Sequence, residues 1–190
     1  AARAFKAVSE DSRHRTYLII GPDHTGLAMG RNVVSDEPFM TPLGECQPDE
    51  GLIADLGLTV DRRAHSREHS IEVMLPFIQT IDPGARIVPI VMGDQSYASA
   101  MDLGHRVSKA CRDRDVFLIA SSDMTHYLPH EVVRRHMGLV AEKLVSMDVP
   151  GMYDVIRRED MSVCGYGPIA AVMAACSPSS VEVLCTTDSW

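Results

Sequence analysis

The segment Thr16–Ile20, with the sequence TYLII, is a short continuous run of apolar residues that stops at a Gly-Pro pair. A run of this length, bounded by turn residues, is typical of a strand whose two faces are both buried. Two later segments have the same character: Ile87–Met92 (IVPIVM) and Val116–Ala120 (VFLIA). We therefore predict three buried strands, although Pro89 is unusual in a strand because it has no N–H to donate.

Segments with a helical spacing of apolar residues separate these strands. The longest is Glu131–Met147, in which apolar residues recur three and four positions apart. Strands that alternate with helices form a mostly parallel sheet with helices on both faces, so we predict one α/β domain over residues 1–190. The remaining predictions are helices at 1–10, 50–56, 66–80, 96–111, 150–157 and 165–176, an irregular hairpin excursion at 31–46 and a last strand at 181–184. Pro76 is expected to kink or stop the helix at 66–80.

The composition excludes several classes of partner. The chain has 190 residues and a net charge of -8, whereas nucleic acids and anionic membranes require a basic face. The five cysteines are an odd number without a C-x-x-C pair, which favours a reducing, cytoplasmic location. No apolar run reaches the length of a membrane span. We therefore expect neither a nucleic-acid nor a membrane partner.

Polar side chains follow two of the predicted strands. Asp23 and His24 come directly after the first strand, and Asp123 and His126 come after the third. Ligands of open α/β sheets bind beyond the carboxyl ends of the strands, so a site is expected there. Cys164 precedes a predicted helix, whose dipole and free N–H groups favour a thiolate, the form that binds metals. Ordinary turn and N-cap roles remain open for the Asp and His residues.

A pair of histidines lies in the segment Ala64–Phe77, AHSREHSIEVMLPF. His65 and His69 are four residues apart, and on a helix they would share one face and present two nitrogens to one metal ion. Glu68 and Glu72 flank His69, and either is able to orient an imidazole. Polar residues at a helix start are an equally ordinary explanation for this pattern.

Five motifs, in order along the chain, together resemble the Memo family. They are GPDHTG at 21–26, TPLG at 41–44, EHSIEV at 68–73 followed by LPF at 75–77, SSDMTH at 121–126 and CGYGP at 164–168. The fold of this family is similar to that of class III extradiol dioxygenases, which are non-haem iron enzymes. The resemblance implies a redox-active metal, iron or copper, bound by His24, His69 and Cys164, with Asp123 and His126 beside it. It does not select His65.

The sequence also departs from the family pattern. The family opens with a strand that carries a P-H-A-G-Y-type motif, and nothing in this chain matches it. We therefore expect the chain to lack the family's N-terminal strand, which leaves open a contribution from that segment to the site. Asp23 stands where the family commonly has Asn, and the chain ends before the last strand expected from the family.

Three functions are compatible with these residues. Two imidazoles and a thiolate favour iron, copper or zinc over magnesium or calcium, so the first is a metal-dependent redox enzyme that uses dioxygen or a small oxidisable substrate. In it, His126 would act as acid and base, and Asp123 would orient it. The second is a non-catalytic module that binds a peptide or protein partner, with Arg31, Arg63 and Arg67 as the nearby cations. The third is hydrolysis by Cys164, His126 and Asp123, although no G-x-S-x-G-like motif surrounds Cys164.

Overall fold

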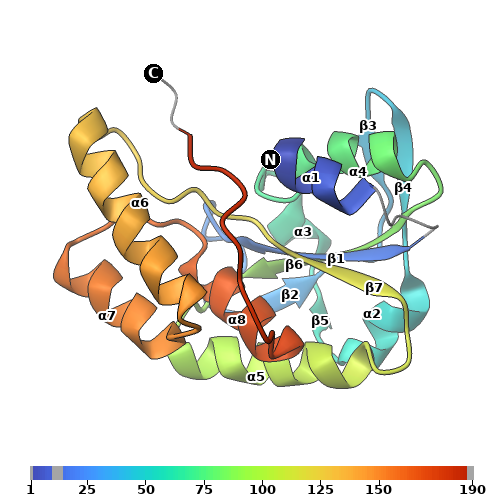
Figure 1. Cartoon of the computed structure of the whole chain (residues 1–190). Coiled ribbons are helices and arrows are strands. Elements are labelled where there is room, and N and C mark those ends of the chain that lie inside the picture. Colours follow the sequence, from blue (N-terminus) through green and yellow to red (C-terminus); the bar gives the residue numbers. More distant parts are fainter. Residues whose placement is uncertain (1, 10–14, 188–190) are drawn as a thin grey trace.

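The computed structural model describes residues 2–9 and 15–187, and its centre is a mixed, mostly parallel β-sheet (Figure 1). The strands follow the order β3-β4-β6-β1-β7, and β2 also pairs with β6 and with β5. The strands are β1 (Thr16–Pro22), β2 (Asn32–Val34), β3 (Phe39–Thr41), β4 (Gly44–Pro48), β5 (Thr59–Val60), β6 (Arg86–Met92) and β7 (Val116–Ala120). The three strands predicted from the sequence are β1, β6 and β7, which lie side by side and parallel. β1 and β6 are buried as predicted, whereas every residue of β7 is only half-buried.

Helices cover both faces of this sheet, as Figure 1 shows. α5 and α8 lie on one face and α1 and α4 on the other. This arrangement confirms the predicted fold class. The helices are α1 (Ala2–Ser9), α2 (Glu50–Leu56), α3 (Arg62–His65), α4 (Leu75–Ile81), α5 (Tyr97–Ala110), α6 (His130–Val145), α7 (Val149–Arg158) and α8 (Tyr166–Cys176), with a 3-10 turn η1 at Glu72–Met74.

The central strand β1 explains why two layers of helices are needed. Leu18 and Ile20 belong to the hydrophobic cluster that includes α5 and α8, whereas Tyr17 and Ile19 belong to the opposite cluster, which includes α4. All four side chains are fully buried. Because successive side chains of a strand point to opposite faces, a strand that is apolar at every position must be covered on both sides.

Pro89 is accommodated inside β6 despite its missing N–H. One edge of β6 pairs with β1 along its whole length. Along the other edge, β4 pairs at Arg86 and Ile87, and β2 pairs from Ile90 to Met92. Pro89 therefore lies at the point where the partner of β6 along this edge changes from β4 to β2.

Two predicted elements are wrong. The predicted helix at 66–80 begins only at Leu75. Pro76, which was expected to kink or stop it, instead occupies the first turn of α4, where a proline needs no hydrogen-bond donor. The segment 181–184, which was predicted to be a strand, follows α8 and has no regular secondary structure. Within the described ranges, no helix is long and apolar enough to span a membrane.

Candidate metal centre

Two clusters of potential metal ligands lie beyond the carboxyl ends of β1 and β7. We call His24, Glu68 and His69 the histidine cluster, and Asp123, His126 and Cys164 the cysteine cluster. In each cluster, one nitrogen, oxygen or sulfur atom per residue lies within 4.8 Å of the corresponding atoms of the other two. β1 and β7 are parallel neighbours, so both clusters are at the same edge of the sheet, as predicted.

Asp23 shapes the loop that carries His24. Its carboxylate accepts hydrogen bonds from the backbone N–H groups of Thr25 (3.1 Å) and Ala28 (2.9 Å), and from the Thr25 hydroxyl. An Asp that bonds the backbone two residues ahead is a typical turn residue. The carboxylate of Asp23 therefore stabilises the loop that carries His24.

Glu68 joins the two histidines of the first cluster. Its side chain is almost completely buried, and its Oε2 accepts the backbone N–H of His24 at 2.6 Å. Its Oε1 lies 2.9 Å from His24 Nδ1 and accepts the backbone N–H of Ser70 at 2.9 Å. Burial alone would raise the pKa of the Glu68 carboxyl, but the hydrogen bonds from His24 and Ser70 outweigh it and hold the pKa below its usual value. Glu68 is therefore an ionised acceptor.

This contact fixes the tautomer of His24. An ionised carboxylate only accepts hydrogen bonds, so His24 Nδ1 carries a proton, and Nε2 is the nitrogen left for another partner. His69 lies beside it, with the two ring centroids 4.5 Å apart and His69 Nδ1 3.5 Å from Glu68 Oε1. Of the two glutamates considered as orienting residues, Glu68 has this role, because Glu72 is exposed in η1.

Gly21 allows the Glu68 segment to approach the end of β1. A Cβ at this position would lie 2.2 Å from Ser70 Oγ, which is too close for two non-bonded atoms. Ser70 Oγ instead donates to the carbonyl of Pro22 at 3.2 Å. The close packing of these segments therefore brings His24 and Glu68 together, although they are 44 residues apart in sequence.

The helical histidine pair suggested by the sequence does not form. α3 ends at His65, and His69 lies outside any helix. His65 is 7% exposed and its ring lies edge-on to Phe39, whereas the His69 side chain is 61% exposed. Burial lowers the pKa of His65 to about 4. His65 is therefore a neutral core residue, and the family motif was the better guide.

In the cysteine cluster, Cys164 and Asp123 are tied by two hydrogen bonds. The backbone N–H of Cys164 donates to the Asp123 carbonyl at 3.1 Å, and the backbone N–H of Asp123 donates to Cys164 Sγ at 3.0 Å. The next residue, Gly165, donates its N–H to Ser122 Oγ at 3.0 Å. The loop after β7 therefore holds the turn that precedes α8.

Ser162, which was not among the predicted site residues, orients His126. Its hydroxyl accepts the backbone N–H of His126 at 2.8 Å, and its carbonyl lies 2.7 Å from His126 Nδ1. A carbonyl only accepts, so Nδ1 carries the proton. The other ring nitrogen, Nε2, lies 3.5 Å from Asp123 Oδ2.

The expectation that Cys164 is a thiolate needs correction. Burial raises the pKa of its thiol, and the Asp123 charge acts in the same direction. The hydrogen bond from the Asp123 backbone is the second-largest effect and lowers the pKa, but by less than burial raises it. In these surroundings the thiol is therefore not activated, and a nearby cation is needed to favour the thiolate.

The structure divides the three predicted ligands between the two clusters. His24 and His69 belong to one and Cys164 to the other, and no group among the described residues contains all three. Their joint binding to one ion stays a prediction.

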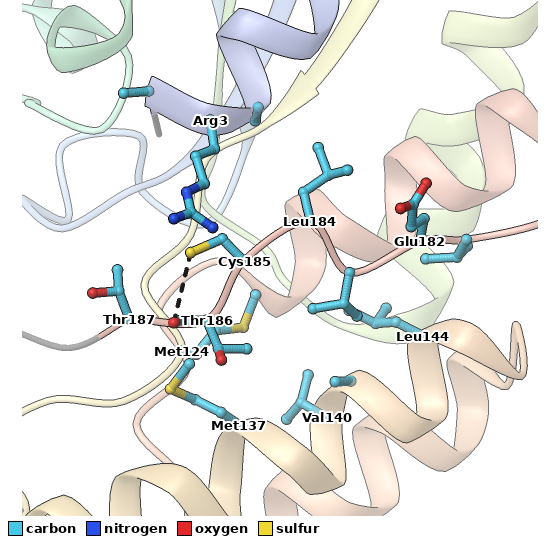
Figure 2. Close-up of a pocket in the computed structure, with 15 residues that line it drawn as sticks. Arg3, Met124, Met137, Val140, Leu144, Glu182, Leu184, Cys185, Thr186 and Thr187 are labelled. Carbon is cyan, nitrogen blue, oxygen red and sulfur yellow. Dashed lines mark hydrogen bonds between the residues drawn. The ribbon is translucent and has the colours of Figure 1, made fainter.

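A large cavity borders the cysteine cluster. It has a volume of about 1080 Å³ and includes Asp123, His126, Tyr127 and Met137 in its wall. An adjoining apolar pocket of about 610 Å³ lies between α1, α6 and the segment 181–187 (Figure 2). Figure 2 shows Arg3 extending from α1 toward Cys185, with Met124, Met137, Val140 and Leu144 on the other side. Small molecules therefore have space beside His126.

The fold and the two clusters define an α/β protein with a candidate metal centre at the carboxyl edge of its sheet. The fold is similar to that of an uncharacterized protein from Escherichia coli K12, with a TM-score of 0.63 and 15% identity over 92% of this chain and 81% of the other. The model of the Memo-like protein family matches residues 1–184, and the chain belongs to this family. The resemblance inferred from the five motifs is thereby confirmed.

Archaeal members of the family are similar over most of this chain. A MEMO1 family protein of Archaeoglobus fulgidus is 42% identical over 83% of this chain and 62% of its own length. Those of Methanothermobacter thermautotrophicus and Caldivirga maquilingensis are 38% and 39% identical, over 92% and 89% of this chain. The chain spans 66% and 62% of these two relatives.

Proposed function

We propose that this protein binds a redox-active metal ion, iron or copper, and uses it on dioxygen or a small oxidisable substrate. The proposed ligands are His24, His69 and Cys164, with Asp123 and His126 beside the ion. One observation carries the proposal: His24 is held by a buried carboxylate through Nδ1, which leaves Nε2 free. Histidines that bind metals usually donate their other ring N–H to a carboxylate or carbonyl in this way.

The clusters fit a metal chemically. His126 resembles His24 in that its Nδ1 is bonded to an acceptor, here a backbone carbonyl, and its Nε2 lies 3.5 Å from Asp123 Oδ2. Imidazole nitrogens and a cysteine sulfur suit iron, copper or zinc, whereas magnesium and calcium prefer oxygen ligands. A cation would also favour the thiolate of Cys164, whose pKa is otherwise raised by burial.

The residues around the cavity have separate roles in this proposal. A bound iron or copper ion would supply electron transfer to or from a molecule in the cavity. His126 is able to accept a proton at Nε2, and Ser162 keeps the ring oriented through Nδ1. Asp123 Oδ2, 3.5 Å from Nε2, stabilises the ring once it is protonated.

The cysteine hydrolase is a weaker alternative, although the structure brings its three residues together. In a nucleophile-base relay, the carboxylate binds one imidazole nitrogen and the nucleophile faces the other. Here the Ser162 carbonyl occupies Nδ1, and Asp123 lies near Nε2. The donor atoms therefore converge on one region, as ligands of an ion do. The pKa of Cys164 is also raised, which opposes its activation as a nucleophile.

Binding of a peptide or protein partner remains the second proposal for the cleft. Arg31, one of the three cations considered for phosphate recognition, is paired with Asp61 at 2.7 Å. Arg63 and Arg67 are exposed. A screen of phosphorylated and unphosphorylated peptides tests this role, and binding that persists in a metal-free sample would favour it over the redox function.

Metal content tests the proposed function directly. Protein purified without a histidine tag is reconstituted anaerobically with Fe(II) or Cu(I), and bound metal is measured by elemental analysis. We expect one equivalent in the unaltered protein and a loss in His69→Ala and Cys164→Ala. His105→Ala and Cys176→Ala are matched controls, because both side chains are exposed and lie outside the two clusters. No metal in the unaltered protein would refute the proposal. Oxygen consumption with a reductant, compared with metal-free protein, then tests the redox role.

A further inference from the structure

Gln95, in the loop between β6 and α5, forms a bridge to the turn that carries Cys164. Its Nε2 donates to the backbone carbonyl of Cys164 at 2.9 Å. Its Oε1 accepts the backbone N–H of Gly167, also at 2.9 Å. One side-chain amide therefore binds both ends of the Cys164–Gly167 turn.

Gln95 is itself fixed in place. Its backbone carbonyl accepts the hydroxyl of Tyr153 at 3.0 Å. A Cβ on Gly167 would lie 2.8 Å from Gln95 Cβ, so only glycine lets the turn approach so closely. A side-chain amide offers a donor and an acceptor at the same end, which a carboxylate or a thioether does not. The contact is therefore specific to an amide of this length.

The turn is held from the opposite side by the loop after β7, through Asp123 and Ser122. β6 and β7 are the two neighbours of β1 in the sheet, and the loop after β1 carries His24. Gln95 and Asp123 therefore secure the Cys164 turn from strands on both sides of β1.

We propose that Gln95 is a positioning residue of the candidate metal centre, which fixes Cys164 Sγ for binding an ion. This inference rests on the proposed metal-binding function. Gln95 does not belong to either cluster and acts only through the backbone of Cys164 and Gly167. Removing an outer hydrogen-bond partner of a metal ligand typically weakens metal affinity by about 10-fold to 100-fold.

The test is a cobalt titration of the unaltered protein, Gln95→Glu and Gln95→Met. Co(II) is the probe because its bond to a thiolate produces a charge-transfer absorption that reports the cysteine ligand. Gln95→Glu keeps the acceptor for Gly167 and places a second oxygen against the Cys164 carbonyl. We expect its Co(II) dissociation constant to rise by about 10-fold or more, with a weaker charge-transfer band. Gln95→Met, which removes both bonds, is expected to be affected at least as strongly.

Gln79→Glu is the matched control. Gln79 also forms two side-chain hydrogen bonds, to the Thr41 hydroxyl and the Gly44 carbonyl, but on the β3–β4 hairpin. We expect its cobalt affinity and spectrum to match those of the unaltered protein. A merely structural role of Gln95 would lower the melting temperature without selectively weakening the thiolate band.

The outcomes separate this inference from the function on which it rests. If the unaltered protein binds Co(II) without a thiolate band, Cys164 is not a ligand and the inference is refuted, whereas the metal content measured with Fe(II) or Cu(I) decides the proposed function. If it binds through a thiolate and the Gln95 variants match it, only the inference is refuted. If neither variant reaches the circular dichroism spectrum of the unaltered protein, Gln95 is required for folding and its assignment as a positioning residue is wrong.

Discussion

Acidification will destabilise this protein through His65, a buried residue that takes no part in the candidate centre. Burial lowers the pKa of its imidazole from 6.5 to about 4, against a smaller opposing effect of its hydrogen bond with the Val33 backbone. Between these pH values the unfolded chain binds a proton that the folded protein does not. The contribution of neutral His65 to the free energy of unfolding is therefore fully present above pH 6.5 and is lost as the pH falls toward 4.

The expected loss is large relative to the stability of a domain. The difference between the two pKa values lowers the free energy of unfolding by about 3 kcal/mol at a pH below both values. At pH 4.5 the loss is about 2.5 kcal/mol. Urea unfolding of the unaltered protein and His65→Gln at pH 7 and pH 4.5 measures it, because glutamine does not titrate. From pH 7 to pH 4.5, the unaltered protein should lose about 2.5 kcal/mol more unfolding free energy than His65→Gln.

His105→Gln is the control for this experiment, because His105 is exposed on α5. Its stability should follow that of the unaltered protein at both pH values. The carboxylates titrate in all three proteins, so their contribution cancels in the comparison. If the stability difference between His65→Gln and the unaltered protein is the same at pH 7 and pH 4.5, the assignment of His65 as a neutral buried group is wrong.

Three further substitutions test the site and its support. Glu68→Gln removes the charge that orients His24 and should weaken metal affinity by about 10-fold to 100-fold in a chelator competition, whereas the exposed neighbour Glu72→Gln should not. Gly21→Ala places a Cβ 2.2 Å from Ser70 Oγ and should cost about 1–3 kcal/mol of unfolding free energy; an unchanged urea midpoint would contradict this. Asp148→Ala removes the side-chain acceptor for the Gly151 N–H at the start of α7 and should cost about 1 kcal/mol, without changing metal content.

The sheet was predictable because its main strands carry their signal locally. β1 and β7 are both continuous apolar runs between turn residues, and this pattern predicted both strands. The predicted burial holds for β1, whereas β7 is only half-buried because it is the last strand in the sheet order. The segment 66–74 was not predictable in the same way. Its apolar residues have helical spacing, yet the side chain of Glu68 binds His24, and a contact so distant in sequence leaves no local pattern.

The candidate centre was predictable in its location and less so in its electrostatics. The rule that ligands bind at the carboxyl edge of a parallel sheet selected His24, Asp123 and His126 correctly as residues of that edge. The helix-start argument for Cys164 failed because it considered the helix dipole and the free N–H groups but not burial, which dominates the pKa of the thiol. Ser162 acts on the His126 ring through its backbone carbonyl, which every residue type possesses, so its identity gave no signal for this contact.

The shared carboxylate of Glu68 also has a consequence for the order of events during folding. It closes a loop of 44 residues, so the His24 ring has no fixed tautomer until the two segments have docked. Any ion that recognises the oriented ring therefore binds the native state and not the unfolded chain. By mass action, an ion at 100 times its dissociation constant would add about 2.7 kcal/mol to global stability. Amide hydrogen exchange across the sheet core would then slow on ion binding, far from the clusters themselves.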